Sequence, residues 1–238
     1  MGSMHTVKSF DEDLRQLRSY ISQMGGLAEA QIMGAIEALS GRDPEMARTI
    51  VERDRAIDDL EVEAERHAIM TIARRQPLAD DLREVISALK IAALLERIAD
   101  YAKNIAKRAT VLSQTEPVQP MVIIPEMGRT VTHMLKDVLD AYGSRDADKA
   151  RAVWERDKNV DDFYNSLFRS LLTYMMENPQ KITPSTHVMF IAKNLERIGD
   201  HATNIAEIIY FNVTGNYMET DRPKSDETAY TIVGKTAE

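Results

Sequence analysis

Carboxylate pairs spaced four residues apart recur in two segments of the chain. The sequence LERIADYAKNIA at residues 95–106 returns as LERIGDHATNIA at residues 195–206, with nine of the twelve positions identical. On a helix, side chains four residues apart share one face, with Cβ atoms about 5–6 Å apart. The polar members of this stripe are Glu96, Asp100 and Asn104 in the first copy, and Glu196, Asp200 and Asn204 in the second. Such a face is rich in oxygen atoms, which suits a hard cation.

A second acidic pair precedes each of these segments. The pieces Arg-Asp, Ala-Arg and Glu-Arg-Asp recur upstream with a shift of 103 residues, whereas the shift between the later segments is 100. They place Asp54 with Asp58 in the first copy, and Asp157 with Asp161 in the second. A self-match at a long, fixed period indicates a duplicated structural unit. Each half of the chain therefore carries two carboxylate pairs.

The four acidic pairs can be interpreted as metal ligands or as a solvated helix face. Like charges at this spacing destabilise a helix by roughly 0.2–0.5 kcal/mol per pair, so four pairs need a compensating cause. Leu82, Ile86 and Leu89 occupy nearly the same helix face as Glu96, so this face is not plainly the solvent-exposed one. Helical bundles build metal sites from carboxylates on facing helices, which favours metal binding here. All-oxygen ligation favours Mg²⁺, Mn²⁺, Ca²⁺ or Fe³⁺.

Composition narrows the class of protein. The chain has 238 residues, no cysteine and a formal net charge of −8. Without cysteine, disulfides, thiolate zinc sites and iron–sulfur clusters are excluded. Nucleic-acid binding is not expected, because it depends on clustered Lys and Arg. No apolar run approaches the roughly 20 residues that span a bilayer, and no secretion signal is recognisable, so we expect a cytoplasmic protein without membrane insertion.

Six long helices are expected to position the acidic residues. The pattern predicts helices over 9–39, 43–74 and 81–112, and again over 125–142, 146–177 and 183–211. Their start signals are Ser9 with Glu12, Asp43-Pro44, Asp81 with Glu84, and Thr183-Pro184. Apolar residues on the third and sixth helices step by four and three, as in a bundle seam: Ile91, Leu95, Ile98, Ala102 and Ile105, and Val188, Ile191, Leu195, Ile198, Ala202 and Ile205.

These helices predict an all-α fold of two tandem, internally duplicated three-helix bundles. The first repeat spans residues 9–112 and the second spans 125–211. Prolines at positions 117 and 120 mark a linker over 113–124. Residues 212–238 have no helical period and contain several helix breakers, so they are expected to form a flexible tail.

The doubled motif resembles the PhoU family of phosphate uptake regulators. The resemblance rests on the paired Leu-Glu-Arg-Ile-(Ala/Gly)-Asp segments and on the upstream Glu-Arg-Asp with DxxxD in each half. It implies a cytoplasmic homodimer with multinuclear iron, manganese, magnesium or zinc sites. It also implies a protein that works with a phosphate ABC transporter ATPase and a sensor histidine kinase, which it holds in the repressing state when phosphate is plentiful.

Carried onto this chain, the resemblance implies metal binding by the eight carboxylates of the four pairs. Asn104, Asn204 and Glu61 are weaker candidates for the metal or its surroundings. The second copy departs from the pattern, because Tyr164 and Phe168 stand where the first has Glu61 and Glu65. The two sites are therefore expected to differ.

Arg97 and Arg197 occur in both copies and could contact a partner. The plainer interpretation is an i,i+3 ion pair with the nearby aspartate on the same helix.

The function expected from this resemblance is that of a non-catalytic, metal-binding adaptor, a negative regulator of the phosphate-starvation response. Its contact with membranes would be peripheral and through partners. One alternative is a carboxylate-bridged metal oxidase or iron store, although such bundles use Glu-x-x-His and no glutamate here lies three residues before a histidine. Another is a PhoU-like accessory of a low-affinity phosphate permease.

Overall fold

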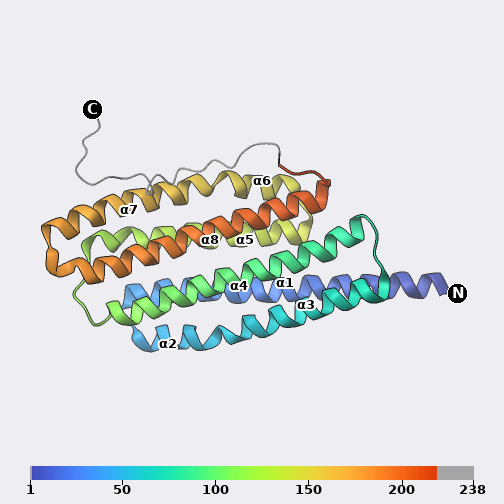
Figure 1. The fold of residues 1–238 in the computed structure, drawn as a ribbon, viewed down its shortest axis with the longest axis horizontal. Helices are drawn as coiled ribbons and strands as arrows, with labels where there is room; N and C mark the ends of the chain where they lie inside the picture. Colours follow the sequence, from blue (N-terminus) through green and yellow to red (C-terminus); the bar gives the residue numbers. More distant parts are fainter. Residues whose placement is uncertain (1, 219–238) are drawn as a thin grey trace.

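The architecture consists of two groups of three helical rods that lie side by side (Figure 1). The structure is a computed structural model that describes the backbone of residues 2–218 and the side chains of residues 9–156 and 158–218. Residues 219–238, most of the expected tail, lie outside the described part of the chain. The elements are α1 (Gly2–Gly41), α2 (Pro44–Arg53), α3 (Arg55–Arg75), α4 (Asp80–Leu112), η1 (Gln119–Ile123), α5 (Ile124–Ser144), α6 (Ala147–Glu155), α7 (Asp157–Glu177), η2 (Pro179–Lys181) and α8 (Ile182–Thr214). The all-helical, duplicated fold is confirmed.

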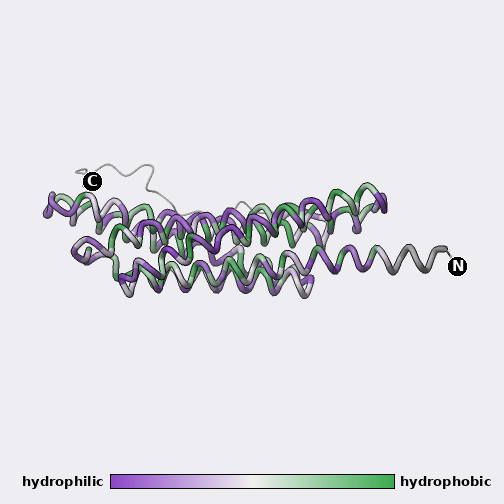
Figure 2. Tube along the Cα trace, turned by 90° about the horizontal axis from the view of Figure 1, so that it is seen from below, coloured by the Kyte–Doolittle hydropathy of each residue, from purple (hydrophilic) through white to green (hydrophobic). Residues whose placement is uncertain are grey.

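Apolar seams on α4 and α8 form the centre of the molecule. The seam residues named from the sequence are all buried, and α4 packs against both α1 and α8. Hydrophobic and hydrophilic residues alternate along each helix, as expected for rods that bury one stripe (Figure 2). Among residues 2–218, no helix is long and apolar enough to cross a membrane.

The helices α1 and α5 also join the two halves, and glycines allow their close approach. A Cβ atom added at Gly25 would lie 2.4 Å from Leu139, and one at Gly128 would lie 2.7 Å from Ile36. A larger side chain at either glycine would require Leu139 or Ile36 to move.

The two predicted helices over 43–74 and 146–177 are each interrupted once. Asp54 separates α2 from α3, and Arg156 separates α6 from α7. At the first break the Ile57 N–H donates to the Asp54 carbonyl at 2.9 Å, and at the second the Asn159 N–H donates to the Arg156 carbonyl at 3.1 Å. These i to i+3 bonds tighten the turn locally. Each pair of helices therefore forms one rod with a short kink at equivalent places.

One predicted helix start is confirmed. Asp43 accepts hydrogen bonds from the backbone N–H groups of Glu45 and Met46, both at 3.0 Å, and so caps α2.

Three other predicted starts are wrong. The helix α1 begins at Gly2, because no proline interrupts residues 2–9, and Ser9 lies inside it. The helix α8 begins at Ile182, continuing from the 3₁₀ turn η2, so Thr183 is not its cap. The helix α4 begins at Asp80 without a side-chain cap, and Glu84 has a different role.

The repeated Arg-Asp dipeptide forms the same joint in both halves. Arg42 and Arg145 adopt left-handed backbone conformations, with φ of 53° and 55°. The next residue donates its N–H to a carbonyl five residues back, which is a Schellman motif with arginine in place of the usual glycine. Each guanidinium then holds one end of α4. Arg42 donates to the Ser113 carbonyl at 3.0 Å, and Arg145 donates to Glu84 at 2.6 Å.

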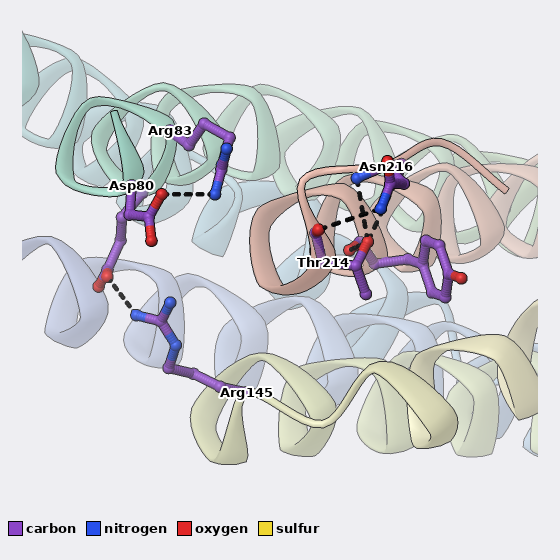
Figure 3. Close-up of polar contacts among 7 residues, drawn as sticks. Asp80, Arg83, Arg145, Thr214 and Asn216 are labelled. Carbon is purple, nitrogen blue, oxygen red and sulfur yellow. Dashed lines mark hydrogen bonds and ion pairs between the residues drawn. The ribbon is translucent and has the colours of Figure 1, made fainter. Parts of the chain in front are cut away.

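Glu84 connects three helices at the junction of the two halves. It is 5% exposed, and its two oxygens accept from Arg18 of α1 at 2.7 Å and from Arg145 after α5. Figure 3 shows Arg145 reaching this junction, beside the Asp80–Arg83 ion pair of 2.7 Å at the start of α4. In the same view Thr214 and Asn216 close the end of α8.

Replacement of Glu84 by alanine is expected to lower the free energy of unfolding by about 1–2 kcal/mol, because it removes the buried carboxylate that pairs with Arg18 and Arg145, whose side chains are 42% and 44% exposed and can be partly satisfied by water. Chemical denaturation of the purified variant measures this change. Glu63→Ala on the exposed face of α3 is the control, with an expected change within about 0.5 kcal/mol. Equal stability of the two variants would contradict the role of Glu84.

Candidate functional site

The kinked α2–α3 rod and α4 bring the first-half carboxylates close to one another. We call this set the first acidic cluster; its members are Asp54, Asp58, Glu61, Glu96 and Asp100. The helix α4 buries Leu95 and Ile98 in its seam, which leaves Glu96 and Asp100 half-buried at the seam's edge. Asp54 lies at the kink and is 4% exposed. The sequence therefore identified side chains that the fold does bring together.

A lysine ammonium group neutralises part of this cluster. Lys103 Nζ forms ion pairs with Asp54 from the kink and with Asp100 from its own helix. Burial alone would lower the pKa of Lys103, but its hydrogen bonds to Asp100 and Asp54 and their negative charges raise it above its ordinary value. Lys103 is therefore a fixed positive charge between α4 and the kinked rod.

The first acidic cluster carries more negative charge than Lys103 neutralises. Burial, followed by the charges of Asp100 and Glu61, raises the pKa of Glu96 to about 7. Burial and the neighbouring Asp54 charge also raise the pKa of Asp58. For Glu61, burial and then the charges of other carboxylates raise the pKa. Two cationic groups, the Lys103 ammonium and the Arg97 guanidinium 3.7 Å from Glu96, do not balance the five carboxylates, so the first acidic cluster keeps an affinity for positive charge or protons.

The second half holds its carboxylates deeper. Asp161 and Glu196 are 3% and 5% exposed, and Asp200 is half-buried. Lys193 Nζ lies 2.9 Å from Glu196 Oε1 and 4.8 Å from the centre of the Tyr164 ring. The side chain of Asp157 is outside the described part of the structure. We use the name second acidic cluster for Asp161, Glu196, Asp200 and Lys193.

The donor chemistry of both clusters suits a hard cation, because the ligands on offer are carboxylates. In the described part of the chain, however, no three His, Cys, Asp or Glu side chains are grouped closely enough to hold a metal ion. Asn104 and Asn204 are half-buried on the same helices. In this structure the first acidic cluster binds the ammonium of Lys103, and a metal ion would need the carboxylates to turn toward a common centre.

The two arginines shared by the copies do not pair as expected from spacing. Arg97 Nε lies 3.7 Å from Glu96, and among residues 2–218 it forms no ion pair with Asp100. The Arg197 guanidinium lies 5.7 Å from the centre of the Tyr101 ring on α4. Both arginines are exposed, so they remain candidates for partner contact.

Sequence reasoning missed Lys103 and Lys193. Each stands three residues from a site carboxylate on its own helix, Lys103 after Asp100 and Lys193 before Glu196. That spacing permits an ion pair and could have revealed both.

The fold and the clusters define an all-helical protein of two duplicated bundles, each with acidic residues beside a lysine. Comparison with known proteins agrees, because the PhoU domain model matches residues 21–109 and 124–209. The chain belongs to the PhoU family. PhoU accessory proteins are regulatory and non-enzymatic, which confirms the expectation that the chain is not an enzyme.

Individual relatives cover nearly the whole chain. It is 56% identical over 214 residues to the phosphate-specific transport system accessory protein PhoU homolog of Zymomonas mobilis, with 90% of each chain covered. The crystal structure of PhoU from Pseudomonas aeruginosa matches with a TM-score of 0.85 and 39% identity, covering 87% of this chain and all of that one. The phosphate transport system regulatory protein PhoU from Streptococcus pneumoniae matches with a TM-score of 0.82 and 29% identity, covering 89% and 100%.

Replacement of Glu96 by glutamine is expected to stabilise the metal-free protein most above pH 7. Because the folded-state pKa of Glu96, about 7, exceeds its ordinary value of 4.5, the wild type loses stability as the pH rises between these values. Glutamine remains neutral throughout and can still donate to Asp100. The expected rise in Tm is about 2–8 °C at pH 8 and smaller near pH 5.

Thermal unfolding in chelator at both pH values measures this difference. Glu63→Gln, on an exposed part of α3, is the matched control and should show no such pH dependence. An equal rise in Tm for Glu96→Gln at pH 5 and pH 8 would show that ionisation of Glu96 does not destabilise the folded protein.

Proposed function

We propose that this protein is an accessory regulator of phosphate-specific transport that represses the phosphate-starvation response when phosphate is plentiful. The observation that carries the proposal is the match to PhoU accessory proteins along almost their whole length, with 56% identity to the homolog of Zymomonas mobilis. The fold supports it, since long rods with exposed faces can engage partner proteins without chemistry of their own.

The proposed partners are the ATPase of the phosphate ABC transporter and the sensor histidine kinase of the phosphate response. The names of two relatives place those proteins in phosphate transport systems. A homodimer is part of the same proposal. The alternative of an iron oxidase or iron store gains no support from the family match. The genetic test below distinguishes the proposed regulator from an accessory of a low-affinity phosphate permease.

Deletion of the gene is expected to leave phosphate-starvation genes expressed in phosphate-rich medium, because the kinase would lose its repressor. An alkaline phosphatase reporter measures the effect, and a plasmid copy of the gene should restore repression. Unchanged reporter activity would contradict the repressor role, and altered low-affinity phosphate uptake in the same strain would favour the permease alternative.

The proposal includes binding of hard metal ions, such as iron, manganese or magnesium and with zinc as a further candidate, by the two acidic clusters. It is supported by the excess negative charge at Glu96 and by the depth of Asp161 and Glu196. When bound, a metal ion would supply positive charge that relieves repulsion between helices.

Joint replacement of Asp100 and Asp200 by asparagine is expected to reduce bound metal by at least half, because each cluster loses an anionic ligand. Elemental analysis after equilibration with Mn²⁺ and gel filtration measures the metal content. Glu63→Gln is the control and should keep the wild-type content. Retention of the full content by the double variant would place the metal elsewhere.

A further inference from the structure

The lysines of the two acidic clusters are not copies of one another. With the shift of 100 residues that relates α4 to α8, Lys103 corresponds to Thr203, and Lys193 corresponds to Ala93. Lys103 follows its aspartate by one turn, whereas Lys193 precedes its glutamate by one turn. The duplicated carboxylates therefore face a lysine in both halves, but from different positions on the helix.

We infer that Lys103 is a built-in counter-cation of the first acidic cluster, and that a divalent metal ion binds there only by displacing its ammonium group. This inference rests on the metal binding proposed above, but it can fail separately. It makes Lys103 the residue that determines how strongly the first acidic cluster binds metal.

The geometry supports mutual exclusion. Lys103 Nζ contacts one oxygen of Asp54 and one of Asp100, which come from the kink and from α4. The Asp54 side chain is 6% exposed and that of Lys103 is 21% exposed, so little solvent separates them. Charge-assisted N–H···O contacts of about 2.7–2.9 Å and metal–oxygen bonds of about 2.0–2.6 Å need nearly the same space. Two cations cannot share these two oxygens without repelling each other.

The second acidic cluster is arranged differently, so removal of Lys103 should act on the first cluster alone. Lys193 pairs with Glu196 and lies over Tyr164, the residue that stands where Glu61 stands in the first copy. The aromatic ring attracts the ammonium group through its face. The second lysine is therefore partly held by a group that a metal ion does not use.

The test compares Mn²⁺ binding to three proteins of full length: the wild type, Lys103→Met and Lys107→Met. Lys107 lies one turn further along α4, is exposed, and has no ion pair within residues 2–218. Its replacement therefore removes one positive charge near the first acidic cluster and leaves the Lys103 ammonium group in contact with Asp54 and Asp100. Electron paramagnetic resonance of free Mn²⁺ gives the affinity and the number of sites. Thermal unfolding with and without Mn²⁺ gives an independent measure.

Lys103→Met is expected to bind Mn²⁺ at least tenfold more tightly at one site, with a larger Mn²⁺-dependent rise in Tm than the wild type. Lys107→Met should change the affinity less than threefold. Adding Asp100→Asn to Lys103→Met should abolish the gain. Lys103→Thr, which introduces the residue of the second copy, repeats the test with a smaller side chain if the methionine variant folds poorly.

An affinity of Lys103→Met within twofold of the wild type, or an equal gain in Lys107→Met, would overturn the inference. If the wild type binds Mn²⁺ and the Lys103 variants bind no better, the inference fails while the metal proposal stands. If only the Lys103 variants bind, the inference stands and metal binding by the native first acidic cluster falls. Absence of binding in all proteins defeats both.

Discussion

Repulsion between half-buried carboxylates is the constraint on which the site depends. At an effective dielectric constant of ~20, two unit charges about 6 Å apart repel by roughly 3 kcal/mol, well above the roughly 0.2–0.5 kcal/mol for a like-charge pair on a solvated helix. Glu96 and Asp100 are half-buried at the edge of the α4 seam, because the neighbouring Leu95 and Ile98 must be buried between the helices. A positive charge among these carboxylates, the ammonium group of Lys103, is therefore part of the folded structure.

Charged side chains also hold the two ends of α4. Arg42 and Arg145 both adopt the left-handed conformation that costs a non-glycine residue about 1–2 kcal/mol, and both use their guanidinium groups to hold α4. One acts on a carbonyl oxygen and the other on the buried Glu84. The central helix is thus held at both ends by equivalent residues of the two copies.

Sequence patterns predicted the parts of the fold that local periodicity determines. Apolar steps of three and four residues located the seams of α4 and α8, and Asp43-Pro44 located the start of α2, because both signals act within a few residues. The kinks at Asp54 and Arg156 were missed, since neither position carries proline or glycine. Glu84 was assigned to a local cap because its true partners, Arg18 and Arg145, lie more than sixty residues away.

The carboxylates of the candidate site could be located from the repeat, but their neutralisation could not. The repeat identifies residues that are identical in both copies. Each of the two lysines has a different residue at the equivalent position of the other copy, Thr203 for Lys103 and Ala93 for Lys193. Glu61 and Tyr164 show the same asymmetry, since one adds negative charge beside α4 and the other offers a ring to Lys193. The fold therefore fixes where negative charge accumulates, while the neutralising lysine stands at a different helix position in each half. Two clusters with the same acidic framework therefore hold their neutralising lysines by different contacts.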